Sequence, residues 1–251
     1  MSGHNKWAKI KHKKAGTDAA RGRLFSRIIK EITIAARNGG GDVNSNPRLR
    51  LAVQTAKDSN MPADNIKRAI QRGTGELPGT VYEEITYEGY GPAGVALMIE
   101  LVTDNKNRTV AELRHILDRN NGKLAEAGSV AWMFQKKGSI EVPKSGVKED
   151  DLLGIILDAG ADDMKSEEDY YDVTTSSEAF DAVKKAIEDK KIPINNAALQ
   201  MLPQNTVRVE GKEAEQVLKL LEALEEHDDV QNVYANFDID DSVMAQLNQS
   251  A

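Results

Sequence analysis

The sequence contains no cysteine among its 251 residues and only four histidines. The absence of cysteine excludes disulfides, thiolate metal sites and cysteine nucleophiles, and it is typical of proteins from a reducing compartment. No stretch approaches the ~20 consecutive apolar residues that a membrane-spanning helix needs. The basic N-terminus lacks the apolar core of a secretory signal. We therefore expect a cytoplasmic protein with no membrane partner.

The patterns of the common catalytic sites are also missing. The sequence has no GxxxxGK[ST] loop, no HExxH motif and no GxSxG elbow. The dinucleotide-binding pattern GxGxxG occurs at Gly89, Gly91 and Gly94, but a strand-like segment follows it and Pro92 lies within it. Binding of a pyrophosphate requires a helix N-terminus at that point. We expect no enzyme activity, no cofactor and no metal site.

Charge is spread very unevenly along the chain. Residues 1–72 contain 16 Lys and Arg against 5 Asp and Glu, a net charge of +11, whereas residues 73–251 have a net charge of −18. This asymmetry favours a basic module that binds a polyanion and is attached to an acidic body. The alternative is a basic module that docks onto the acidic part of its own chain.

Three helices are predicted before a Gly- and Pro-rich boundary at residues 73–80. The first spans residues 17–38 and stops at three consecutive glycines. Asn46 is the expected N-cap of the second, with Pro47 at its first position, where a missing N–H costs nothing. The third follows Pro62 and ends at Gly73, in the helix-terminating role common for glycine. Together these helices predict an N-terminal three-helix bundle.

Beyond residue 80 the pattern predicts strands and helices in alternation. Strands are expected at 82–88 and 95–102, joined by a turn at 89–94, and another strand is expected at 129–135. Thr109 and Glu112 match the capping box T-x-x-E and predict the start of a helix that ends near residues 121–122. Much later, a strand at 207–209, a helix at 212–227 and a strand at 230–237 form a β-α-β unit.

The segment between these parts has the order β-α-β-β-α-β, with a strand at 139–142, a helix from 149, strands at 164 and 171, a helix from 177 and a strand near 198. That order is typical of a ferredoxin-like unit. We predict an α and α+β multidomain chain: a basic helical domain with an N-terminal arm (1–79), a ferredoxin-like α+β domain (80–136 plus 204–240) with one extra strand, an inserted ferredoxin-like α+β domain (137–203) and a C-terminal tail (241–251). Continuous domains in series are the alternative.

The arm and the first helices provide the candidate nucleic-acid-binding residues. The arm has five lysines and no acidic residue before Asp18, and lysines displace counterions from phosphates. On the first helix the cations gather opposite the apolar face, which suits a bundle helix that lies against phosphates. Trp7 could stack on a base, although packing on the bundle is the commoner role of a single tryptophan. The candidates are Lys6, Trp7, Lys9, Lys11, His12, Lys13, Lys14, Arg21, Arg23, Arg27, Lys30, Arg37, Arg48 and Arg50.

Several motifs resemble those of the YebC/PmpR family over essentially the whole chain. They are GHNKW at 3–7, KHKK at 11–14, NPRLR at 46–50, NMP at 60–62, YEGYGP at 87–92, TDNKNRT at 103–109, GSV at 128–130 and DVQNVY at 229–234. The resemblance implies a helical bundle and two α+β domains. It implies a DNA-binding transcriptional regulator, but also a translation factor, because a mitochondrial relative is described as a translational activator and bacterial members are linked to ribosomes stalled at proline-rich stretches.

The resemblance draws attention to the turn at residues 103–109. Asn and Asp cap helices and form turns for structural reasons, whereas a helix N-terminus with adjacent cations could hold a phosphate. Both interpretations stay open for Asn105, Lys106, Asn107, Arg108 and Thr109. Tyr87 and Tyr90 are candidates for stacking on bases, although cross-strand packing is the commoner role.

Three functions follow from these observations. The first is a non-enzymatic, DNA-binding regulator of transcription, and the second is a factor that binds ribosomal RNA or the ribosome and assists translation. The first is the leading hypothesis. One observation supports the second, because no helix-turn-helix can be defended: the first two helices are joined by a seven-residue Gly-rich loop, longer than that motif usually allows. The third is a protein-interaction scaffold whose basic bundle docks internally.

Overall fold

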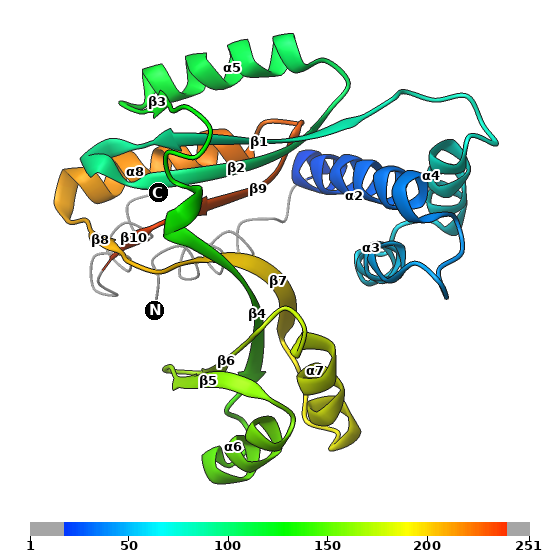
Figure 1. The fold of residues 1–251 in the computed structure, drawn as a ribbon, viewed down its shortest axis with the longest axis vertical. Coiled ribbons are helices and arrows are strands. Elements are labelled where there is room, and N and C mark those ends of the chain that lie inside the picture. Colours follow the sequence, from blue (N-terminus) through cyan, green and yellow to red (C-terminus); the bar gives the residue numbers. More distant parts are fainter. Residues whose placement is uncertain (1–17, 240–251) are drawn as a thin grey trace. The chain divides into compact units, whose positions relative to one another are not determined.

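The computed structural model describes residues 18–239, and these form two compact units. Unit 1 comprises residues up to 131 and from 205 onward, and unit 2 comprises residues 132–204. Within the described residues there are seven α-helices and ten strands, and the sheets are mainly antiparallel (Figure 1). Among these residues no helix combines the length and the apolar composition needed to cross a bilayer.

Unit 1 begins with three helices that enclose one apolar core. They are α2 (Asp18–Gly39), α3 (Pro47–Asp58) and α4 (Ala63–Thr74), and their buried residues include Ile32, Leu49 and Ile66. The predicted cap of α3 is confirmed, because the side chain of Asn46 accepts a hydrogen bond from the Leu49 N–H at 3.0 Å and Pro47 occupies the first helical position. The same side chain donates to the carbonyls of Ala35 and Gly40, which joins the end of α2 to the start of α3.

The end predicted for the third helix is wrong. Helix α4 continues through Gly73 to Thr74, and the residue with the left-handed backbone is Gly75, at φ 82°. Gly73 instead allows a close approach of two helices, since a Cβ there would lie 2.4 Å from the Thr33 carbonyl oxygen and 2.7 Å from the Ala36 Cβ. Glycine is required at this position for space, which a search for helix terminators does not consider.

A four-stranded antiparallel sheet forms the rest of unit 1. Its order is β3-β1-β2-β9, from β1 (Glu83–Tyr90), β2 (Ala96–Thr103), β3 (Lys123–Leu124) and β9 (Val230–Ala235). Helices α5 (Lys106–Arg119) and α8 (Gly211–Glu225) contact each other and supply leucines to the sheet's core. A 3-10 turn, η1 (Pro92–Gly94), joins β1 to β2.

Strand β1 lies between β2 and β3 and pairs with β2 along its whole length. The sheet of unit 1 differs from the prediction in the β-α-β unit expected at residues 207–237. The short β8 (Val207–Arg208) pairs in parallel with β10 (Phe237–Asp238) instead of joining this sheet. The strand predicted at 230–237 is interrupted at Asn236, whose side chain accepts the Ala96 N–H at 2.6 Å.

The strand predicted at residues 129–135 is also wrong. This segment is a loop followed by the 3-10 turn η2 (Ala131–Met133), and β4 starts only at Phe134. The reason is the buried carboxylate of Glu88, which accepts hydrogen bonds from the N–H groups of Gly128 (2.6 Å), Val130 (2.6 Å) and Ala131 (2.9 Å). Burial alone would raise the pKa of Glu88, but these N–H groups lower it overall.

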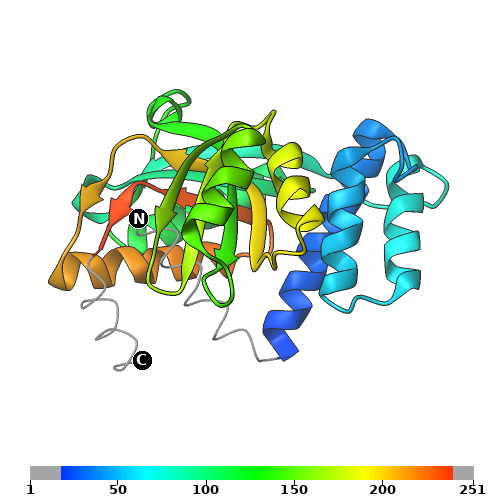
Figure 2. The ribbon, with the colours of Figure 1, turned by 90° about the horizontal axis from the view of Figure 1, so that it is seen from below.

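Unit 2 has the element order predicted for it. The elements are β4 (Phe134–Pro143), α6 (Glu149–Asp158), β5 (Ala161–Ser166), β6 (Tyr170–Thr175), α7 (Phe180–Asp189) and β7 (Asn196–Pro203). The strand order is β5-β6-β4-β7, and all neighbours are antiparallel. Helices α6 and α7 lie side by side over one face of this sheet (Figure 2), where Ile140, Ile156 and Val183 are fully buried.

Candidate nucleic-acid interface

The predicted arm lies outside the described residues. This applies to Lys6, Trp7, Lys9, Lys11, His12, Lys13 and Lys14. The other predicted cations are on α2 and α3, and the structure divides them into residues that contact the acidic part of unit 1 and residues that are exposed.

Three cations of α2 face the carboxyl end of α8. The Arg27 guanidinium donates to the Glu225 carbonyl, the Lys30 ammonium donates to the Asp228 carbonyl at 2.9 Å, and Arg23 lies 3.8 Å from the Glu226 carboxylate. The C-terminal end of a helix has partial negative charge and unsatisfied carbonyls, so cations are stabilised there. Burial lowers the pKa of Arg27, and its Nε has no hydrogen-bond partner among residues 18–239. These cations therefore bind their own chain in this structure.

The most buried ion pair of this contact joins Lys30 to Asp229. Their side chains are 12% and 6% exposed, and Lys30 Nζ lies 2.7 Å from Asp229 Oδ1. The other carboxylate oxygen, Oδ2, accepts from Thr103 Oγ1 at 3.0 Å, Thr109 Oγ1 at 2.7 Å and Arg108 Nη2 at 2.8 Å. Burial by itself raises the pKa of Asp229, but the hydrogen bonds outweigh it and hold the pKa far below its ordinary value.

The remaining cations of α2 and α3 differ in their contacts. Arg48 forms a bidentate pair with Glu31, at 2.7 and 2.9 Å, and also binds Glu84, and these hydrogen bonds raise its pKa. Arg50 donates to two carbonyls of the preceding loop, at 2.8 and 3.0 Å. Arg21 and Arg37 are exposed.

The turn at residues 103–109 has the structural contacts expected of a cap. Asn105 caps α5 by accepting the Arg108 N–H at 3.1 Å, so the helix begins at Lys106 and the capping box predicted from Thr109 is wrong. Thr109 is inside the helix and fully buried. Its hydroxyl donates to the Asp229 carboxylate. Arg108 pairs with Asp104 and Asp229, whereas Lys106 and Asn107 are exposed.

The two tyrosines proposed for stacking have different surroundings. Tyr87 is half-buried and packs against the core of the unit 1 sheet. Tyr90 donates weakly to the Ser129 carbonyl at 3.4 Å, and Lys123 Nζ lies 6.0 Å from the centre of its ring. Tyr90 and Lys123 line a cavity of about 420 Å³ together with Gly91, Gly94, Asn121 and Gly122.

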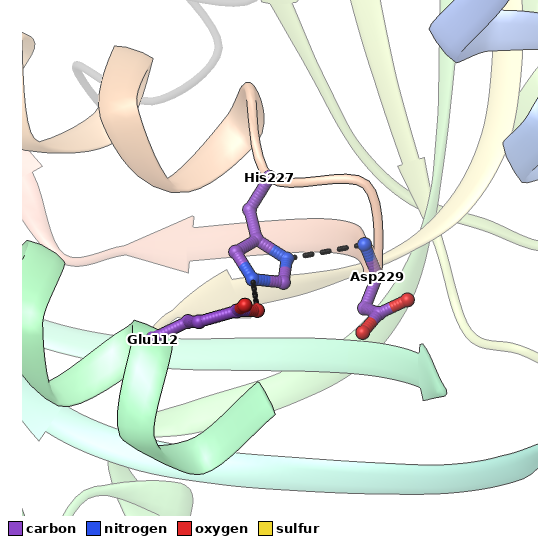
Figure 3. A group of neighbouring side chains, drawn as sticks. All are labelled: Glu112, His227 and Asp229. Carbon is purple, nitrogen blue, oxygen red and sulfur yellow. Dashed lines mark hydrogen bonds and ion pairs between the residues drawn. The ribbon is translucent and has the colours of Figure 1, made fainter. Parts of the chain in front are cut away.

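One cluster in unit 1 has the residue types of a metal site. Ligand atoms of Glu112, His227 and Asp229 lie within 4.8 Å of one another (Figure 3). However, His227 Nδ1 accepts the Asp229 N–H at 3.1 Å, and Nε2 lies 2.9 Å from Glu112. The Asp229 carboxylate already binds two cations. A neutral imidazole protonated on Nε2 satisfies both contacts, so we assign the cluster a structural role.

Comparisons with known proteins identify the family. The family model described as "TACO1/YebC protein N-terminal domain" matches residues 5–76, and the one described as "TACO1/YebC second and third domain" matches residues 82–237. The chain belongs to the TACO1/YebC family. The resemblance seen in the sequence motifs is thereby confirmed.

Relatives of similar length share most of this TACO1/YebC chain. A protein of Chlorobaculum parvum named "Probable transcriptional regulatory protein" is 57% identical over 250 residues, which cover 99% of this chain and 100% of the relative. A protein of Natranaerobius thermophilus with the same name is 55% identical over 97% and 99% of the two chains. The crystal structure of the conserved hypothetical protein Aq1575 of Aquifex aeolicus has a TM-score of 0.84 at 47% identity, and it covers 94% of this chain and 98% of its own.

The predictions for this TACO1/YebC chain missed one group of cations. Lys67, Arg68 and Arg72 of α4 are exposed, although no cation of this helix is among the predicted nucleic-acid-binding residues. The spacing i, i+1, i+5 on a helix with apolar residues at 66 and 69 was the available signal.

Proposed function

We propose that this chain is a non-enzymatic, nucleic-acid-binding regulator of gene expression, and specifically a DNA-binding regulator of transcription. The single observation behind the proposal is the net charge of +11 in residues 1–72, opposed by −18 in the rest of the chain. Clustered positive charge binds phosphates without needing an active site. The names of relatives that are more than 50% identical over the full length support the regulatory role.

We also propose a domain organisation for this function. Residues 1–79 form a basic helical bundle with its arm, residues 137–203 form a ferredoxin-like domain, and residues 80–136 with 204–240 form the domain that surrounds it. The strand order β5-β6-β4-β7 supports the ferredoxin-like description of the inserted domain. The arm contacts phosphates first, assisted by the exposed Arg21 and Arg37, and the exposed Lys106 and Asn107 form a second contact.

The test is the salt dependence of binding by the full chain. Fluorescence anisotropy is measured with a 25-base-pair DNA duplex at increasing salt, and six to ten phosphate contacts predict an affinity loss of roughly 10³–10⁵ between 50 and 200 mM. Reversal of Lys9, Lys11, Lys13 and Lys14 to Glu should abolish this binding. The matched control reverses Lys165, Lys185, Lys190 and Lys191, all exposed in unit 2, and should leave it intact. Binding that is independent of salt would contradict the proposal.

Ribosomal RNA is the other polyanion that the same cations could bind. Folded RNA is bound through shape and phosphates without a recognition helix. Crosslinking in cells followed by sequencing of the bound nucleic acid separates the two: promoter DNA supports the transcriptional role, and ribosomal RNA supports a translation factor.

A protein-interaction scaffold is favoured by two specific observations. The basic face of α2 docks onto α8, which is the internal neutralisation expected for such a scaffold. In addition, Leu153 and Leu157 of α6 are 36% and 57% exposed among carboxylates. Limited proteolysis at residues 73–80 tests the role of this docking. A linker that is protected in the full chain and cleaved after Asp229→Asn supports the scaffold, and equal cleavage of both proteins contradicts it.

A further inference from the structure

The outer face of α4 is cationic, and its inner face packs against α2. Lys67, Arg68 and Arg72 are exposed on one side of the helix, and Ile66 and Ala69 are buried on the other. Figures 1 and 2 both place α4 at the outer edge of the three helices. The stem of Arg72 lies over Gly79, where an added Cβ would be 3.1 Å from its Cγ. The charges are thus presented on an ordered helix that α2 supports from behind.

These cations have no carboxylate partner in the described residues, unlike Arg23, Lys30 and Arg48. Within residues 18–239 none of the three forms an ion pair, and α4 and the turn after it contribute only Asp64 and Glu76 as acidic neighbours. Glu76 is directed to Thr74, at 3.1 Å, and to Gln71, at 3.5 Å. In contrast, Lys30 pairs with the Asp229 carboxylate, and the Arg27 guanidinium donates to the Glu225 carbonyl. Helix α4 therefore presents three cations that an external polyanion can bind without displacing an internal carboxylate.

Neighbouring elements extend this face. The end of α4 packs against the end of α2, since an added Cβ on Gly73 would lie 3.2 Å from the backbone nitrogen of Arg37. Arg37, which is exposed, is therefore next to the end of α4. Helix α4 follows α3 after only residues 59–62, a connection within the length found in helix-turn-helix motifs. The longer loop that argued against such a motif joins α2 to α3 instead.

We propose that α4 is the helix through which this chain contacts duplex DNA, with Lys67, Arg68 and Arg72 bound to phosphates. The proposal rests on the proposed function and assigns it a surface. An α-helix fits the major groove of B-DNA, and side chains on its outer face reach the phosphates of the groove walls. Contacts of this kind fix position and orientation and add to affinity without selecting a sequence.

The experiment neutralises the face and measures the salt dependence of binding. The variant Lys67→Gln/Arg68→Gln/Arg72→Gln keeps the apolar stems, including the one over Gly79, and far-UV circular dichroism with thermal unfolding verifies its fold. On the same DNA duplex, the slope of log K against log[salt] should become shallower by about 0.9 for each lost phosphate contact. If all three contacts of the triple variant are lost, the slope should change by between about two and three. The matched control, Lys185→Gln/Lys190→Gln/Lys191→Gln, removes the same charge from unit 2 and should retain the wild-type slope.

The outcomes separate this inference from the proposed function. A wild-type slope in the α4 variant overturns the assignment of α4, while the slope of the wild-type chain still supports nucleic-acid binding. A wild-type chain without salt-dependent binding overturns both. An RNA hairpin of equal charge is measured in parallel, and a slope change confined to RNA overturns the assignment to duplex DNA.

Discussion

The carboxylate of Asp229 binds four side chains of unit 1, and its neutralisation should destabilise the contact between α2 and α8. The substitution Asp229→Asn keeps the shape of the side chain but replaces one acceptor oxygen with a donor. If the amide oxygen takes the position of Oδ2, the amide nitrogen faces the Lys30 ammonium. If the amide oxygen instead takes the position of Oδ1, the amide nitrogen faces Arg108 and the two threonine hydroxyls. Either orientation places a donor against a cation.

The burial of each partner sets the size of the effect. Asp229 and Lys30 are nearly inaccessible, and removal of one partner from a buried pair costs about 3–5 kcal/mol because the other charge is left uncompensated. The Arg108 side chain is 43% exposed, so its pair adds less than about 1 kcal/mol. We expect Asp229→Asn to lower the free energy of unfolding by about 3 kcal/mol, which for a domain of this size lowers the Tm by roughly 6–12 °C.

Urea unfolding and calorimetry measure this loss, and pH supplies an independent check. Because the pKa of Asp229 is lowered in the folded state, its charge contributes stability above the unfolded pKa of about 3.9 and loses that contribution as pH falls through the folded value. The difference between the wild type and Asp229→Asn should therefore be complete at pH 7 and shrink below about pH 5.

Asp228→Asn is the matched control, since it neutralises the exposed carboxylate one position earlier. Its cost should stay within about 0.5 kcal/mol. Equal effects of the two substitutions, or a difference that does not depend on pH, would refute the assignment of the buried charge to Asp229.

Three further substitutions test other parts of the fold. Glu88→Gln should cost about 2–3 kcal/mol, because it weakens hydrogen bonds to three buried or half-buried N–H groups, and it should speed proteolysis at residues 125–131 relative to the exposed Glu126→Gln. Gly73→Ala should destabilise by about 1–3 kcal/mol through overpacking, whereas Gly154→Ala, which has no atom within 4 Å of the new Cβ, should stabilise by up to about 1 kcal/mol in thermal unfolding. Asn46→Ala should cost about 2 kcal/mol in urea unfolding, because it removes the cap of α3 and two hydrogen bonds to carbonyls.

The sequence predicted those elements whose ends are determined by nearby residues. Asn46 and Pro47 mark the start of α3 because the capping contact reaches only three residues, to Leu49. The element order of unit 2 was likewise visible in the alternation of strand and helix patterns, and the structure confirms that order. Such signals depend on local hydrogen bonds and periodicity, which a single sequence contains.

The errors occur where a distant residue decides a local choice. Thr109 and Asn105 are both plausible N-caps of α5. Which of them caps the helix depends on Asp229, because its carboxylate, 120 residues away in the sequence, accepts the hydrogen bond of the Thr109 hydroxyl. Residues 129–135 have strand-like composition, but Glu88 binds the N–H groups that a strand would use for pairing. Gly73 likewise is required because the Thr33 carbonyl of another helix leaves no space for a Cβ. Tertiary contacts of this kind override local preference and have no pattern in the surrounding sequence.

The contact between α2 and α8 also changes what the charge asymmetry implies for binding. Groups 198 and 199 positions away, namely two carbonyls and the Asp229 carboxylate, bind the face of α2 that seemed the clearest phosphate site in the sequence. A phosphate could reach Lys30 only by displacing Asp229, and that exchange would leave a buried carboxylate without its cation. The cations of α4 require no such exchange, since no internal carboxylate pairs with them in the part of the chain that the structure describes. Competition between internal carboxylates and external phosphates therefore favours α4 over α2 as the helix that binds a polyanion.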